Sequence, residues 1–150
     1  MSMPQNQYLG IYLRTSISEG GLHYKPGPVI RARQNSDLIL NMQIVDLSKG
    51  KSPHSLHMKH VRFIVRKDKY PRSEEDILIV LDSNSGIVHE SVSNGLVKVH
   101  IPHEELDLPV TDYWYDILLY DLGEFDFGDL NATEDEELIR PPLGRFKVMK

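Results

Sequence analysis

Apolar residues recur at every second position through much of the chain, and this period of two is the pattern of a β-strand with one buried face. The alternation is clearest in three segments, at residues 38–45, 61–65 and 97–101. Around residues 61–65 the alternating positions are His60, Arg62, Ile64 and Arg66, three of them polar or charged, which predicts a half-buried strand. No segment carries a sustained apolar stripe at the helical period of 3.6 residues. The sequence therefore predicts an all-β fold.

Three further segments are interpreted as strands from their composition. Residues 77–81 are apolar without alternation and are short, which predicts a strand covered on both faces. Residues 113–121 are the most aromatic part of the chain, which predicts a central strand. Residues 144–148 form the last strand, and residues 8–14 and 86–90 are candidates for two more.

Turn residues separate these segments at the spacing of a β-sandwich. Asn94-Gly95 lies between two strand-like segments and is the strongest hairpin signal. Residues 102–106 begin with proline and predict one helical turn. We therefore expect an immunoglobulin-like antiparallel β-sandwich at residues 30–150, which contains a long acidic loop at residues 122–142. An extended N-terminal arm with a Gly/Pro-rich connection, residues 1–29, precedes it.

Composition excludes several classes of site and partner. The chain has no cysteine, so it has no disulfide, no thiolate metal site and no cysteine nucleophile. The net charge of -5 argues against a nucleic-acid partner. The first residues lack the features of a signal peptide, and no apolar run approaches the ~18 residues of a membrane helix. We expect synthesis in a cytoplasm, with no nucleic-acid partner and no membrane association.

Two groups of side chains and the acidic loop are candidate metal ligands. The first group is a triplet spaced by three residues, His54, His57 and His60, and the second is His100, His103, Glu104 and Glu105. The triplet follows a proline and leads into a strand, so its members do not share a helical face. The acidic loop offers carboxylates but lacks the spacing of a calcium loop. We expect no metal and no cofactor, and these three places remain the alternatives.

Asp116 lies in the middle of the aromatic segment, where a charge is costly unless it is paired. A catalytic carboxylate is one interpretation. The favoured one is a structural contact across the sheet, with one of three arginines, Arg62, Arg66 or Arg145. Motifs for a serine nucleophile, a phosphate-binding glycine loop and a zinc protease are absent. We therefore expect no catalytic and no cofactor-binding residues, and a protein that is not an enzyme.

Two short motifs near the end of the chain carry a family resemblance. Residues 113–117 read Tyr-Trp-Tyr-Asp-Ile and residues 144–148 read Gly-Arg-Phe-Lys-Val. Together with the order of strands over residues 35–149, they resemble a small β-sandwich domain of tailed-bacteriophage structural proteins, a group that includes the N-terminal domain of upper baseplate proteins. In that group the corresponding strands read Tyr-x-Tyr-Asp-Ile and Gly-x-Phe-x-Val. The acidic loop and the arm have no counterpart in the resemblance.

The resemblance implies a non-enzymatic structural component of a bacteriophage virion, in the tail, baseplate or neck, assembled in the host cytoplasm. Its partners would be other virion structural proteins, and it would form a homo-oligomer in a symmetric assembly. The expected interface residues are Tyr8, Ile11 and Tyr12 in the arm and Phe125 and Phe127 in the acidic loop. The alternative is a carbohydrate- or receptor-binding module of a fibre or adhesin. That alternative needs two or three coplanar surface aromatics from among Tyr70, Tyr113, Trp114 and Tyr120.

Overall fold

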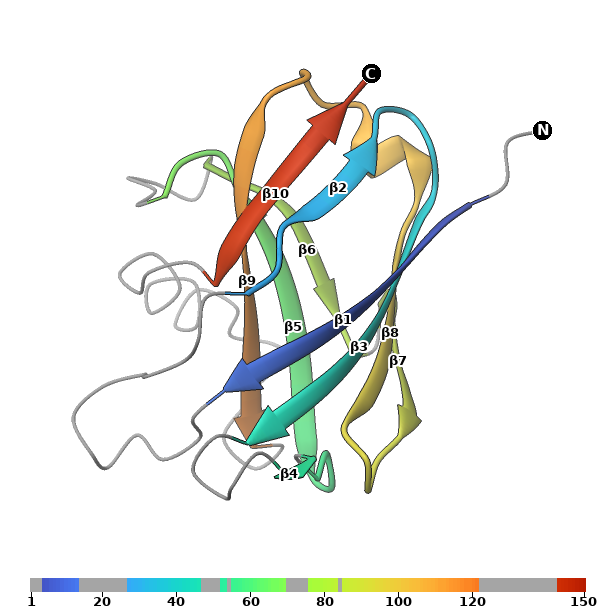
Figure 1. Cartoon of the computed structure of the whole chain (residues 1–150), viewed down its shortest axis with the longest axis vertical. Coiled ribbons are helices and arrows are strands. Elements are labelled where there is room, and N and C mark those ends of the chain that lie inside the picture. Colours follow the sequence, from blue (N-terminus) through green and yellow to red (C-terminus); the bar gives the residue numbers. More distant parts are fainter. Residues whose placement is uncertain are drawn as a thin grey trace.

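Two β-sheets packed face to face make up the structure (Figure 1). The computed structural model describes residues 4–13, 27–46, 52–53, 55–69, 76–83, 85–121 and 143–150. Sheet A has the strand order β1 (Gln5–Leu13), β3 (Leu38–Asp46), β8 (Leu96–Ile101) and β7 (Ile87–Ser91), and β4 (Ser52–Pro53) pairs with the end of β3. Sheet B has the order β2 (Ile30–Arg33), β10 (Gly144–Met149), β9 (Asp112–Asp121), β5 (Lys59–Arg66) and β6 (Ile77–Asp82).

The predicted all-β sandwich is confirmed, but one edge of each sheet is parallel rather than antiparallel. β1 runs parallel to β3, with Gln5 opposite Leu38 at the start of the pairing. β2 runs parallel to β10, with Ile30 opposite Phe146. The other paired strands are antiparallel. Both parallel strands are therefore edge strands, and the antiparallel prediction holds for the rest of each sheet.

β1 corrects the predicted arm. The predicted arm covers residues 1–29, but Gln5–Leu13 forms a full strand of sheet A, as residues 8–14 suggested. Ile11 is completely buried and belongs to the core between the sheets, so the prediction of Ile11 as an interface residue is wrong. The alternation in β1 is hard to recognise because glutamines occupy two of its inward-facing positions, Gln5 and Gln7.

The core lies between the two sheets and is built from the inward positions of nearly every strand. Phe63 of β5 stacks on Tyr115 of β9 with ring centroids 5.8 Å apart, and Phe146 of β10 contacts Phe63 at 6.3 Å. Each of these rings is fully buried. Burial of one such side chain contributes about 1.5–3 kcal/mol, so the aromatic motifs of residues 113–117 and 144–148 serve the core.

The predictions for β5 and β6 are both corrected by their places in sheet B. β5 lies between β9 and β6, and its outward side chains Arg62, Ile64 and Arg66 are as buried as its inward ones. It is therefore not half-buried. β6 is the edge strand, and Val80 is 43% exposed, so β6 is not covered on both faces.

Two local predictions for the connections are confirmed. β7 and β8 form an antiparallel hairpin, and Gly95 in its turn has a φ of 67°, a conformation that favours glycine. A short 3-10 helix, η4 (His103–Leu106), follows Pro102. β9 lies between β10 and β5, as a central strand should.

Within the described residues, no helix has the length and apolar character that crossing a membrane requires.

Two glycines allow the chain just before β2 and at the start of β10 to pack closely against Tyr115. A Cβ on Gly27 would collide with the Tyr115 hydroxyl, and one on Gly144 would lie 2.9 Å from the Tyr115 ring. The Tyr115 hydroxyl donates to the Pro28 carbonyl at 2.7 Å, and the Gly27 amide donates to the Leu143 carbonyl at 2.8 Å. Burial raises the pKa of Tyr115, which therefore stays a hydrogen-bond donor.

Candidate functional site

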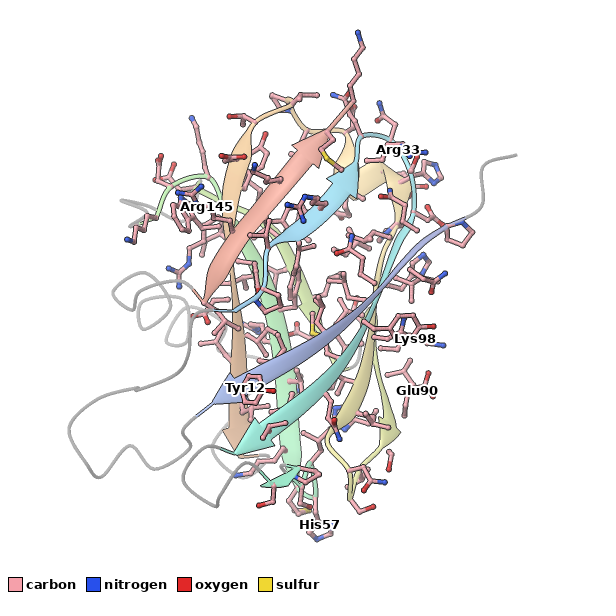
Figure 2. All side chains as sticks on the ribbon, viewed as in Figure 1. Tyr12, Arg33, His57, Glu90, Lys98 and Arg145 are labelled. Atoms are coloured by element: carbon pink, nitrogen blue, oxygen red, sulfur yellow. The ribbon has the colours of Figure 1, made fainter. Side chains whose placement is uncertain are left out.

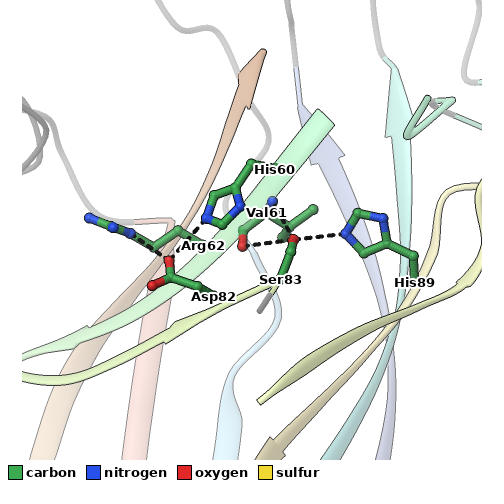
Figure 3. Close-up of polar contacts among 6 residues, drawn as sticks. All are labelled: His60, Val61, Arg62, Asp82, Ser83 and His89. Atoms are coloured by element: carbon green, nitrogen blue, oxygen red, sulfur yellow. Dashed lines mark hydrogen bonds and ion pairs between the residues drawn. The ribbon is translucent and has the colours of Figure 1, made fainter. Parts of the chain in front are cut away.

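The group of polar side chains that comes nearest to a reactive site joins β5, β6 and β7 (Figure 3). Its first half centres on Asp82, the last residue of β6. The Asp82 Oδ1 accepts a hydrogen bond from Arg62 Nε at 2.8 Å and lies 3.2 Å from His60 Nε2. His60 and Arg62 are each 1% exposed, so this carboxylate supports two buried side chains of β5.

The second half of the cluster centres on Ser83. Its Oγ accepts the Val61 amide hydrogen at 2.8 Å and lies 3.3 Å from the Val61 carbonyl oxygen and 2.8 Å from His89 Nε2 (Figure 3). A serine beside a histidine can be a nucleophile with its base. Here the hydroxyl holds the backbone of β5, and the neighbouring Asp82 contacts His60 rather than His89. The contacts of Ser83 therefore join sheet B to His89 of sheet A.

Burial favours the neutral form of the two histidines in this cluster. Burial lowers the pKa of His60, although the contact with Asp82 opposes that shift. Burial also lowers the pKa of His89, and the nearby His60 lowers it further. Neutral imidazoles suit the geometry, because Nε2 of His60 can donate to Asp82 and Nε2 of His89 can share a hydrogen bond with Ser83 without a buried positive charge.

Asp116 makes one of the structural contacts that the sequence predicted. Its Oδ2 lies 3.4 Å from Arg66 Nη2, and its Oδ1 accepts the Ile117 amide hydrogen at 2.8 Å. Asp116 and Arg66 are both fully buried. Of the other two candidate partners, Arg62 contacts Asp82 and Arg145 lies over the Trp114 ring.

The first group of candidate metal ligands is divided between a loop and a strand. His57 is exposed in the turn before β5, His60 is buried on β5, and His54 lies outside the described residues. Among the described residues there is no group of three or more histidine and acidic side chains that could hold a metal ion. The acidic loop, 122–142, also lies outside the described residues.

The second group is organised by an aspartate that the sequence did not single out. Asp37 Oδ1 accepts the His103 amide hydrogen at 2.7 Å and lies 3.0 Å from His103 Nδ1, while Oδ2 lies 3.3 Å from His100 Nε2. His103 Nε2 lies 3.3 Å from Glu104 Oε1. Hydrogen bonds from His103 and His100 lower the pKa of Asp37. The four side chains are exposed, and Asp37 links the start of β3 to η4.

Two of the predicted interface residues share the outward face of sheet A. Tyr8 is 81% exposed, and Tyr12 is partly exposed with its ring 3.5 Å from where a Gly10 Cβ would lie. The outward position of Tyr8 follows from the alternation in β1, because Ile11 points inward. Phe125 and Phe127 lie outside the described residues.

The outward face of sheet A is continuous across four strands, and we call it the sheet A face. One row runs from Tyr8 through Asn41 and Lys98 to Val88 by strand register. Lys98 Nζ lies 3.0 Å from Glu90 Oε1, and Figure 2 shows both side chains on the outer side of β7 and β8. The exposed apolar members of this face are Tyr8, Val88 and Leu96. Tyrosine is enriched in protein contacts, so Tyr8 is the member of this face that best suits one.

Of the four aromatic residues that the carbohydrate-binding alternative draws on, the structure describes two side chains, Tyr113 and Trp114, and only Trp114 reaches the surface. Tyr113 is 3% exposed, and its hydroxyl donates to the Pro109 carbonyl at 2.7 Å, so it belongs to the core. The Trp114 ring has Lys69 Nζ at 5.4 Å and the Arg145 guanidinium at 5.5 Å from its centroid. Tyr70 and the side chain of Tyr120 lie outside the described part of the chain.

Comparison with known proteins gives a likeness of fold. No family model and no curated protein matches the sequence. The structure is similar to the N-terminal domain of ORF48 of phage TP901-1, with 10% sequence identity and a TM-score of 0.52 over 97% of this chain and 99% of that chain. It is also similar to a laccase from Pediococcus acidilactici, with 10% identity and a TM-score of 0.38 over 96% of this chain and 26% of that chain. Reduced rusticyanin is 9% identical, with a TM-score of 0.39 over 99% of this chain and 82% of that chain.

Proposed function

We propose that this chain is a non-enzymatic structural component of a bacteriophage virion that acts in the tail, baseplate or neck. The observation that carries the proposal is the similarity to the phage TP901-1 domain over nearly the full length of both chains. The resemblance of residues 113–117 and 144–148 to phage β-sandwich domains is a second, sequence-based argument for the same class. Its partners are other virion proteins and further copies of itself.

The sheet A face is the proposed contact surface for these partners. Its exposed apolar groups lie on paired strands, so little backbone freedom is lost when a partner covers them. Tyr8 is the main anchor, since tyrosine brings a large contact area and a polar end to an interface. The protein then functions by presenting a fixed geometry to its neighbours in a symmetric assembly.

The test is the location and incorporation of the protein in particles of the phage that carries its gene. We expect antibodies against the chain to label one fixed part of purified particles, and we expect complementation with a Tyr8→Ser/Val88→Ser variant to reduce the amount incorporated severalfold. Both side chains are exposed, so the fold tolerates the change. The matched control is Val110→Ser, a valine of similar exposure to Val88 that lies outside the strands of sheet A.

Three outcomes separate the parts of this proposal. Absence of the protein from purified particles contradicts the virion role. Normal incorporation of the Tyr8→Ser/Val88→Ser variant contradicts the sheet A face as the contact surface and leaves the virion role standing. Selective glycan binding that disappears in Trp114→Ala would instead support the carbohydrate-binding alternative.

A further inference from the structure

The outward face of β2 and β10 carries four cationic side chains, and we call it the basic face. Arg31 and Arg33 alternate with the buried Ile30 and Ala32 on β2, which places both arginines outward. On β10, Arg145 and Lys147 alternate in the same way with the buried Phe146 and Val148. Strand register sets Arg31 beside Lys147, so the four positions form one continuous patch at the edge of sheet B.

Little negative charge offsets this patch. Within the part of the chain that the structure describes, no carboxylate lies within ion-pair distance of Arg31, Arg33, Arg145 or Lys147. Asp112 is the acidic residue opposite Lys147 in the register. The ion pairs described above lie on β5, β6, β7, β8, β9 and η4 and at Asp37 before β3, and the carboxylate on β9, Asp116, is fully buried against Arg66. The basic face therefore has cations available for an external anion.

Trp114 orients one of these cations. The Arg145 guanidinium lies 5.5 Å from the centroid of the Trp114 ring, opposite it in the register. A guanidinium stacked on an aromatic ring keeps its N–H groups at the edge, where they can bind a carboxylate with two hydrogen bonds. Because the stacked arginine is already ordered, it loses less side-chain freedom when it binds.

The chain itself carries a segment of complementary charge. Seven acids lie between Glu124 and Glu137, with no lysine or arginine among them. Residues 122–142 hold those seven acids and one base, Arg140, so of the 17 basic and 22 acidic residues the rest of the chain keeps 16 and 15. The negative net charge is therefore concentrated in this acidic run, and the rest of the chain is close to neutral.

We propose that the basic face binds the acidic run of a second copy of this chain. This inference names the partner chemistry within the proposed assembly role and rests on it. Alternate residues of an extended peptide are about 6.6 Å apart, which matches the spacing of alternate cations along β10. A contact between two different surfaces of identical copies is head-to-tail, and such contacts generate rings when the rotation closes.

A carboxylate partner fits this face better than a nucleic acid. Single-stranded nucleic acid is held by aromatic rings free for base stacking. The Trp114 ring instead has Arg145 and Lys69 near it. Four cations beside Asp112 also make a small footprint for a phosphate backbone.

The test is binding of a fluorescent peptide of residues 122–142 to the full chain, followed by anisotropy in about 50 mM salt. We expect saturable binding that weakens at least about tenfold in Arg145→Glu/Lys147→Glu, because two attractions become repulsions. Lys98→Glu, a charge reversal on the sheet A face, is the matched control and should leave the affinity within about twofold. A peptide with its seven acids changed to amides should not bind. Thermal melting establishes that each variant is folded.

The remaining outcomes overturn the proposal in distinguishable ways. Equal peptide affinity in wild type and Arg145→Glu/Lys147→Glu shows that the basic face is not the site. A second outcome is that the wild-type chain does not bind the peptide, whereas a full chain with its seven acids changed to amides does. In that case the basic face is already occupied by residues 122–142 of the same chain. If neither binds, the face takes no acidic peptide. Tighter binding of a 20-nucleotide single-stranded DNA, lost in the same double variant, identifies a nucleic-acid site. None of these measurements needs phage particles, so the virion role can fail or hold independently.

Discussion

The buried pair of Asp116 and Arg66 tests how the centre of sheet B is stabilised. Asp116→Asn keeps the acceptor for the Ile117 amide but removes the charge opposite a fully buried guanidinium. We expect the free energy of unfolding to fall by about 3 kcal/mol, because removal of one partner of a buried pair leaves the other charge poorly compensated. Urea denaturation monitored by Trp114 fluorescence measures it.

The exposed pair of Glu90 and Lys98 is the matched control for that substitution. Its N–O distance is 3.0 Å, shorter than in the buried pair, yet both side chains are more than 40% exposed. Glu90→Gln should cost less than about 1 kcal/mol, since water and salt screen the attraction. A cost for Glu90→Gln equal to that for Asp116→Asn would mean that burial does not decide the strength of these pairs.

His60 and His89 give the folded state a dependence on pH. Burial sets both pKa values below the ordinary 6.5, so below that pH the unfolded chain binds more protons than the folded one. Stability should therefore be full above about pH 7 and should fall as the pH drops through 6.5 toward the lowered pKa values. Denaturation midpoints between pH 5 and 8 measure the slope, which His89→Gln should reduce. His57→Gln, in an exposed turn, should leave the slope unchanged.

The strand β1 shows what a single element contributes and what its sequence conceals. Ile11→Ala should lower the free energy of unfolding by about 2–5 kcal/mol, because the side chain is fully buried between the sheets. Tyr8→Ala, three positions earlier on the outward face, should change it by less than about 0.5 kcal/mol. Chemical denaturation of the two variants and the wild type measures both changes in the free energy of unfolding. Equal, small effects would restore the arm that the sequence predicted for residues 1–29.

The elements predicted best are those whose burial follows from local alternation. Residues 38–45 and 97–101 have strictly alternating burial in the structure over most of their length, as their apolar pattern predicted. β5 and β6 are strands as predicted, but their burial was predicted wrongly because it depends on which strands flank them. Arg62 and Arg66 look exposed in the sequence but lie in a central strand, whereas the apolar residue Val80 lies at an edge. Strand order in a sheet is a long-range property that alternation does not encode.

The same limit applies to the candidate surfaces. Tyr8 and Tyr12 were predicted as contacts from the supposed arm, and the structure places both on an ordered sheet face instead. The contacts of Ser83 with Val61 and His89 had no sequence signal, because they join residues on three different strands or turns. The basic face also depends on the parallel pairing of β2 with β10, which brings Arg31 beside Lys147.

At the scale of the whole molecule, polar side chains close both open sides of the sandwich. On the side of β6 and β7, Ser83 bridges the sheets through Val61 and His89. On the other side the edge strands β1 and β2 meet without forming a ladder. Gln7 accepts the Arg31 amide hydrogen and donates to the Arg31 carbonyl, and Gln5 accepts the Arg33 amide hydrogen at 3.1 Å. These glutamines satisfy the exposed backbone of β2, which would otherwise be a free sheet edge.

The hydrogen bonds from Gln5 and Gln7 to β2 should protect the Arg31 and Arg33 amides from hydrogen exchange. In Gln5→Ala/Gln7→Ala the Arg31 and Arg33 amides lose their acceptors, so their hydrogen exchange should speed up by about tenfold or more, which corresponds to about 1.4 kcal/mol. Amides of the core strand β9 exchange only when the whole protein unfolds. Their exchange rates should therefore increase less than those of Arg31 and Arg33, by the amount that the substitutions reduce global stability. The control is Asn6→Ala, whose side chain lies on the outward face between the two glutamines. If Arg31 and Arg33 keep their protection, the edges are held by the core alone, and the bridge at Ser83 then needs the same test.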